Sequence, residues 1–384
     1  MTSPNDDDPT RRELWRGCVP LEIHLARDEV ASVVEPAPYF ALVPRSAYLP
    51  TWCEEQSDDG KSTSPRAHFA GSTADYPELD DDDGKTQPSK KNQPWFDHQG
   101  IPLRWQLPIG VLFDLVGNNN KHNRGVPFKV TAHYRGPVPT ECSGEPFHGN
   151  DTASGGPETD TPADTPAGIP STNTSTQFSD SGLFVCPDTK TCRSHFFNSL
   201  KEACFIRTGS ATRVMQMTNQ AQGELWKSAL SGDFQLARVA EGQLGRGEAV
   251  DSDVGGNVTT QSGSNLADGT TTSSSNTQPV SVRLPIRVYV RDSHAFSNWR
   301  DVRYVSAPMR SIFSGDETFE GAKRRSIVRD ALRLAVGREI DETQKKWACT
   351  VQGIDVGLDT DLELIHASLR GPDRFSHLVF SRAK

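Results

Sequence analysis

Apolar side chains recur at every second position in several stretches near the two ends of the chain, a pattern typical of half-buried strands. Residues 19–25 alternate in this way, and the proline-bounded apolar run 38–44 is the expected partner strand. Residues 128–134 and 281–290 show the same alternation. We therefore expect one sheet near each end of the chain.

Further segments complete two units of the same order. The first unit gains a short helix that ends at Gly17 and a helix-like segment at 108–116. The second gains a strand at 302–305, a helix at 326–336 and strands at 348–351 and 376–380. Strand, strand, helix and strand in succession favour an α+β protein with two ubiquitin-like β-grasp domains.

The middle of the chain has helical periodicity instead. Phe196, Leu200 and Ala203/Cys204 recur at the i, i+4, i+7/i+8 spacing in a helix predicted over 195–207, which Gly209 ends. Further helices are predicted over 211–217, 220–230 and 233–244. A helix-rich domain should therefore lie between the two ubiquitin-like domains.

Three stretches poor in apolar residues interrupt these patterns. The acidic stretch 55–93 lacks the ligand spacing of a calcium-binding EF-hand, and we interpret it as a disordered insertion. The predicted organisation is a helix segment at 1–18, a first ubiquitin-like domain at 19–139, a linker at 140–182, a helix-rich domain at 183–244, a linker at 245–279 and a second ubiquitin-like domain at 280–384.

Charge argues against some classes of partner. The formal net charge of -9 over 384 residues speaks against a nucleic-acid-binding protein. Basic clusters at 323–325 and 345–346 fit either a membrane or partner surface or an ordinary solvated face. No run approaches the roughly 18 apolar residues of a membrane span, so we expect any membrane contact to be peripheral.

The cysteines and the N-terminus indicate a reducing compartment. There are seven cysteines, an odd number, and the acidic N-terminus lacks the apolar core of a secretory signal. Cys186, Cys192 and His195 are too few for a structural zinc site, so we expect no metal and no cofactor. G-x-S-x-G, P-loop and H-E-x-x-H motifs are absent, and the sequence offers no active site of its own.

Lys201 lies about 100° past Leu200 on the predicted helix, at the border of its apolar stripe. The residue alone is compatible with a solvated surface charge or with an attachment point for another protein. Because lysine amines are ordinarily protonated at neutral pH, an acyl acceptor needs a depressed pKa or a partner enzyme that deprotonates it.

Longer segments resemble the autophagy protein 5 family, of a fungal type with long low-complexity insertions. They occur in family order at 14–20, 38–49, 100–105, 108–115, 197–203, 225–226, 233–234, 284–289, 351–354 and 372–378. The sequence departs from the family pattern in its three insertions and at Cys204, where the family usually has an acidic residue.

This resemblance implies a non-catalytic scaffold. Lys201 lies where the family is joined through an isopeptide bond to the ubiquitin-like autophagy protein 12, by E1- and E2-like enzymes. The family's conjugate binds the coiled-coil autophagy protein 16 and acts like an E3 that directs autophagy protein 8 onto phosphatidylethanolamine. By resemblance, the chain is expected in the cytoplasm and peripherally at the phagophore membrane.

A scaffold of this kind should present a groove between its domains for an apolar partner helix. Trp15, Trp105 and Trp226 are the candidates to line it, with core packing as the alternative role for each. Two other hypotheses remain open: a cysteine-dependent transferase that uses Cys192 or Cys204 with His195, and a ubiquitin-like adaptor that has lost conjugation.

Overall fold

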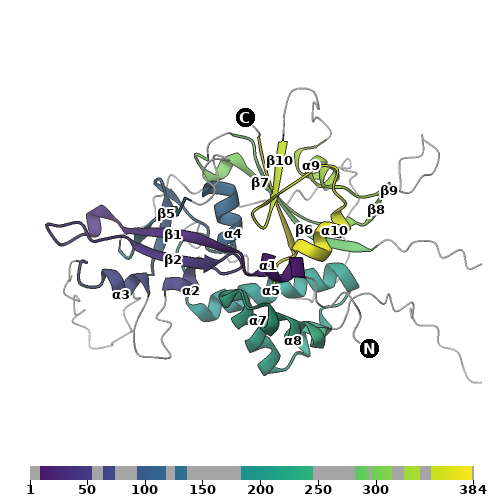
Figure 1. Ribbon diagram of the computed structural model, residues 1–384, viewed down its shortest axis with the longest axis horizontal. Helices are drawn as coiled ribbons and strands as arrows, with labels where there is room; N and C mark the ends of the chain where they lie inside the picture. The colour runs from purple at the N-terminus through teal and green to yellow at the C-terminus, as the bar shows by residue number, and fades with distance from the viewer. Residues whose placement is uncertain are drawn as a thin grey trace, which may run out of the picture.

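The computed structural model describes residues 9–53, 64–73, 93–117, 126–135, 183–244, 282–293, 296–313, 324–337 and 347–382. Figure 1 shows two sheets side by side, with the teal helices packed beneath them. Helix α1 (Pro9–Trp15) lies where the sheets and the helices meet.

The first sheet contains β1 (Cys18–Leu25), β2 (Tyr39–Pro44), β3 (Trp95–His98), β4 (Ile101–Pro102) and β5 (Phe128–His133). Their order is β2-β1-β5-β3-β4, with β1 and β5 parallel and the other pairs antiparallel. Helix α4 (Ile109–Leu112), which continues as a π-helical turn over Phe113–Gly117, contributes Leu112 and Leu115 to the core of this unit.

The second sheet contains β6 (Arg283–Arg291), β7 (Val302–Arg310), β10 (Trp347–Val351), β11 (Ile354–Val356) and β12 (Ser376–Arg382). Its order is β11-β10-β12-β6-β7. When the five strands of each sheet are numbered along the chain and the second sheet is read from its β7 edge, both sheets have the order 2-1-5-3-4. Helices α9 (Val328–Val336) and α10 (Leu362–Leu369) pack on one face. Both predicted ubiquitin-like β-grasp units are confirmed.

The helical part consists of α5 (Thr189–Thr208), α6 (Thr212–Met215), α7 (Asn219–Ser231) and α8 (Phe234–Leu244). Helix α5 starts six residues before the predicted first residue, His195, because the Asp188 side chain caps it by accepting a hydrogen bond from the Thr191 amide at 2.8 Å. It ends at Gly209, whose φ of 76° is left-handed, as the sequence predicts.

Shorter elements fill the connections. They are α2 (Leu49–Cys53), α3 (Pro65–Phe69), the 3-10 turns Arg27–Glu29 and Trp299–Asp301, and a small ribbon of β8 (Ile312–Phe313) and β9 (Arg324–Arg325). Helix α3 lies within the stretch predicted to be disordered, so that prediction is wrong for residues 64–73. Phe69 is fully buried, and the Ala31 amide donates to the Ser72 carbonyl at 2.9 Å, so apolar burial and backbone pairing order this piece. The rest of the predicted insertion and both predicted linkers lie almost entirely outside the described residues.

The three parts share one core. Phe196 and Trp226 of the helical part, Leu21 and Tyr48 of the first unit, and Tyr289 of the second belong to a single apolar cluster. A separate cluster between the second sheet and helices α9 and α10 includes Leu284, Val288 and Leu332. Helix α5 consequently packs against a face of the second sheet that its own helices leave free.

Candidate functional site

Lys201 lies on helix α5 at the edge of the buried stripe formed by Phe196, Leu200, Ala203 and Cys204. Its side chain is half-buried and lines an open groove of about 420 Å³ between α5, α6 and α7. The other residues of this groove are Lys190, Arg193, Ser194, Phe197, Asn198, Val214, Met215 and Gln222. The predicted position of Lys201 at the border of the stripe is confirmed, and the residue lines a groove rather than the core.

The residue after Lys201 anchors helix α5 to the second sheet. Glu202 Oε2 accepts a hydrogen bond from Arg287 Nη2 of β6 at 2.9 Å, and Glu202 Oε1 accepts one from Ser306 Oγ of β7 at 3.1 Å. Arg287 Nη2 also donates to Ser199 Oγ at 3.2 Å. Two positions of α5 that flank Lys201 are therefore tied to the second ubiquitin-like unit.

Arg287 is itself held by a buried polar network. Its guanidinium lies 3.8 Å from the centre of the Phe375 ring, and its Nη1 lies 3.8 Å from Asp373 Oδ2. Burial alone would raise the pKa of Asp373, but the neighbouring His377 and Arg287 bring it below its ordinary value. His377 lies 3.1 Å from that carboxylate and 3.1 Å from the Tyr289 hydroxyl. The anchor of α5 therefore has support within the second unit.

The geometry is unfavourable for the cysteine-dependent alternative. Cys192 and Cys204 are both buried. Burial raises the pKa of the Cys204 thiol, against the opposing effect of Arg374, so the thiolate is disfavoured. Burial lowers the pKa of His195, whose Nε2 lies 3.2 Å from the Gln106 carbonyl oxygen. Among the described residues, no three His, Cys, Asp or Glu side chains group as a metal site.

The three candidate tryptophans are not brought together. Trp105 packs against His195, and Trp226 packs between Tyr48 and Phe196, so both belong to the shared core. Trp15 packs against Phe234 in a small separate cluster. Of the three, Trp15 alone lines a pocket between α1 and the two ubiquitin-like units, whereas Trp105 and Trp226 have the alternative role of core packing.

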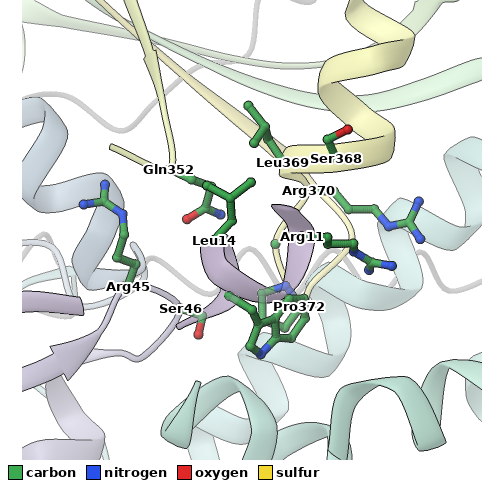
Figure 2. A pocket seen from close by; sticks show the side chains of 11 residues that line it. Arg11, Leu14, Arg45, Ser46, Gln352, Ser368, Leu369, Arg370 and Pro372 are labelled. Atoms are coloured by element: carbon green, nitrogen blue, oxygen red, sulfur yellow. The ribbon is translucent and has the colours of Figure 1, made fainter. Parts of the chain in front are cut away.

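A pocket where helix α1 meets the two ubiquitin-like units, which we call the junction pocket, is shown in Figure 2. Its apolar lining comes from Leu14 and Trp15 of α1 and from Leu369 and Pro372 at the end of α10 and just beyond. The polar lining includes Arg11, Arg45, Ser46, Gln352, Ser368 and Arg370. The free space is only about 20 Å³, which is room for about one water molecule and too little to enclose a small-molecule ligand.

Arg45 joins the two sheets beneath this pocket. It pairs with the buried Asp114, whose Oδ2 also accepts a hydrogen bond from the Gly353 amide of the second unit at 3.0 Å. Burial raises the pKa of Asp114, and Arg45 opposes that shift. Gly353 has a left-handed φ of 79°, and a Cβ there would lie 2.9 Å from Arg45 Nη1, so glycine is needed for the close approach.

Glu202, Arg287 and the arginines of the junction could not be assigned a role from the sequence. The contacts of Glu202 join positions 85 and 104 residues apart in the chain, which no local pattern encodes. One signal was available: Arg287 alternates with apolar residues on a strand, where a charge usually faces solvent, and here that face is covered.

Comparisons with known proteins agree with this architecture. Three family models match: "Autophagy protein ATG5, UblA domain" over residues 14–134, "Autophagy protein ATG5, alpha-helical bundle region" over 189–236 and "Autophagy protein ATG5, UblB domain" over 283–380. Together they cover both sheets and most of the helical part.

Individual relatives and one solved structure are also similar to this chain. "Autophagy protein 5" of Arabidopsis thaliana is 25% identical over 95% of each chain. The same-named protein of Oryza sativa subsp. japonica is 26% identical over 80% of this chain and 66% of its own length. The crystal structure of Kluyveromyces marxianus Atg5 shares the fold, with a TM-score of 0.55 at 17% identity, over 97% of this chain and 98% of that one. Because plant and fungal proteins both match, the comparisons do not single out a fungal type.

Proposed function

The chain belongs to the autophagy protein 5 family, and from this premise we propose that Lys201 is the residue joined by an isopeptide bond to the ubiquitin-like autophagy protein 12. In that reaction the amine of Lys201 attacks the thioester carbonyl of the charged E2-like enzyme. The new C–N bond replaces the C–S bond, the enzyme's cysteine leaves as the thiol, and the amine gives up its proton. The protein is then the acceptor substrate, and its partner enzymes supply the catalysis.

One observation carries this proposal. Lys201 opens onto a groove, while the residues that flank it on α5 are tied to the second sheet through Arg287 and Ser306. An acceptor amine must meet the thioester carbonyl at a fixed distance and direction, and a helix anchored on both sides restricts its motion. The lysine thus combines access with a defined position.

The junction pocket is the proposed docking site for autophagy protein 16. A helix that lays apolar side chains into a groove is a recurring mode of peptide recognition, and Leu14, Trp15, Leu369 and Pro372 offer such side chains a contact surface. The resulting assembly would act like an E3 that promotes lipidation of autophagy protein 8. It would work in the cytoplasm and peripherally at the phagophore membrane; among the described helices, none is long and apolar enough to cross a bilayer.

The direct test is a denaturing blot of cell extracts for a covalent adduct. Lys201→Arg keeps the charge but removes the reactive amine, so the adduct and the lipidation of autophagy protein 8 are both expected to disappear while circular dichroism stays unchanged. Lys227→Arg, at an exposed position of α7, is the matched control and should keep both. An adduct that persists in Lys201→Arg contradicts the proposal.

The same assay separates the two alternatives. A cysteine-dependent transferase would lose activity in Cys192→Ala or Cys204→Ala, whereas an acceptor scaffold should still form the adduct in both. An adaptor that has lost conjugation would show only the unmodified mass of the chain in intact mass spectra from cells. We expect the heavier species.

A further inference from the structure

Arginines gather beside the junction pocket, where α1, the end of α5 and the loop after α10 meet. We call Arg11, Arg370 and Arg374 the arginine cluster; Arg207 lies near them. Figure 2 shows the guanidinium groups of Arg11 and Arg370 close to one another, both directed away from the apolar part of the pocket. His366 is buried beside them, and burial, followed by these cations, lowers its pKa well below the ordinary value.

The cluster has fewer negative charges than positive ones. Glu241 of α8 pairs with Arg11 at 2.8 Å. Among the described residues, no carboxylate lies within ion-pair distance of Arg370 or Arg374, although Arg374 contacts the Cys204 thiol. The three guanidinium groups of the arginine cluster and this one carboxylate leave two positive charges without a counter-charge; Arg207, which has an interaction of its own, is left out of this count. Two other buried arginines do have one, since Arg45 pairs with Asp114 and Arg287 with Glu202.

Neither solvent nor a helix end balances this charge. The side chains of Arg11 and Glu241 are each only 15% exposed. Arg370 is half-buried, and burial, with neighbouring Arg11 and Arg374, lowers its pKa to about 10 against the opposing effect of Glu241. Arg370 also caps the C-terminus of α10, but a helix end supplies only about half a negative charge, less than the two that are needed.

We propose that the arginine cluster is a binding site for a phosphate-type oxyanion. A phosphate group carries a charge of about -1.5 to -2 near neutral pH, close to the excess here, and its oxygens match the planar donor fork of arginine. A single carboxylate would neutralise only half of the excess. The site is separate from Lys201 and needs no assumption about conjugation.

The test is calorimetric titration of the folded protein with pyrophosphate at constant ionic strength. We expect saturable binding, with at least a tenfold loss of affinity in the double variant Arg370→Gln, Arg374→Gln. Arg310→Gln, an exposed arginine of β7, should bind as the unmodified protein does. Absent binding, or equal binding by the double variant, overturns the proposal.

A second measurement, the melting temperature, distinguishes loss of the binding site from misfolding of the double variant. Without pyrophosphate, the double variant should melt at a temperature equal to or higher than that of the unmodified protein, because repulsion has been removed. Added pyrophosphate should raise the melting temperature of the unmodified protein by several degrees and leave that of the variant unchanged. A variant that melts well below the unmodified protein, or responds equally to pyrophosphate, contradicts the proposal.

Vesicle sedimentation identifies the source of the phosphate. Phosphatidylcholine vesicles with a few per cent of a phosphoinositide should retain the unmodified protein better than the double variant if a lipid headgroup fills the site. If pyrophosphate binds but the vesicles do not distinguish the two proteins, the ligand is a soluble phosphate. Either vesicle result is compatible with the oxyanion site, because absent pyrophosphate binding alone already overturns the proposal.

Discussion

The two sheets have the same strand order but differ in how many faces they bury. In the first, β1 alternates strictly between buried and partly exposed residues, and Phe40 and Leu42 of β2 stand 63% and 70% exposed. In the second, seven of the nine residues of β6 are buried, including Tyr289 at 2% exposure. The difference is helix α5, which covers the face of the second sheet opposite to α9 and α10.

This difference assigns the two units different roles around Lys201. The second sheet supports α5, the helix that carries Lys201, through Tyr289 and through the contacts of Arg287 with α5. The first unit reaches the same helix from another side, where Tyr48 and Trp105 pack against His195. The same fold thus supports a helix in one copy, whereas in the other copy the corresponding face is exposed at Phe40 and Leu42 of β2 and buried at β3.

The largest contrast should come from aromatic residues on corresponding faces. Tyr289→Ala removes a buried ring between the second sheet and the helical part and should cost about 3–5 kcal/mol of unfolding free energy. Phe40→Ala, on the free face of the first sheet, should cost less than about 1 kcal/mol. Urea denaturation of both variants measures the difference, and equal losses would mean that the faces are equivalent.

A smaller effect is expected from acid. His366 of α10 is buried and lies 3.0 Å from Ser376 Oγ of β12, and its pKa is lowered by burial and nearby arginines. The fold therefore favours the neutral ring. Its contribution to stability is complete above the unfolded pKa of about 6.5 and is lost as pH falls below it, by at most about 1.4 kcal/mol per pH unit.

The measurement is the melting temperature between pH 7.5 and 5. His366→Gln should flatten that pH dependence, whereas His24→Gln, at a partly exposed position of the first sheet, should not. An identical pH profile in His366→Gln and the unmodified protein would remove this histidine as the source of acid sensitivity.

The smallest stability effect concerns the anchor of α5. The Glu202 side chain is 46% exposed, so loss of its contacts with Arg287 and Ser306 in Glu202→Gln should cost only about 0.5–1 kcal/mol. The rate of conjugation should nevertheless fall clearly in Glu202→Gln, because the position of Lys201 is less restricted without these contacts. The control is Glu13→Gln, which breaks an exposed pair with Arg16. Single-turnover conjugation rates unchanged in Glu202→Gln would refute a positioning role.

The sequence predicted elements better than it predicted contacts between them. The alternation in β1 and β5 and the stripe of α5 are local patterns, and both lie where they were expected. The burial of the outer face of β6 was not foreseen, because its outward residues include Arg283, Arg287 and Arg291, which usually mark a solvated face. Arg291 is 3% exposed and donates to the Leu115 carbonyl of the first unit at 2.6 Å.

The same limit applies to the candidate site. Lys201 could be placed at the edge of its helix from spacing alone, but its acceptor role rests on family resemblance. The groove tryptophans could not be told from core tryptophans, because Trp105 and Trp226 are large apolar residues under either interpretation and tertiary packing decides between them. The order of residues 64–73 was not predicted, because a five-residue helix is too short for a helical repeat of apolar residues to be recognised.

The most direct test of the account is peptide mass mapping of the cellular protein after tryptic digestion. We predict a branched peptide in which the C-terminal residues of the ubiquitin-like partner are attached to the side chain of Lys201, with no other lysine modified in this way. A branch on a different lysine, or no branched peptide in cells with active autophagy, would contradict the claim that α5 presents Lys201 as the acceptor.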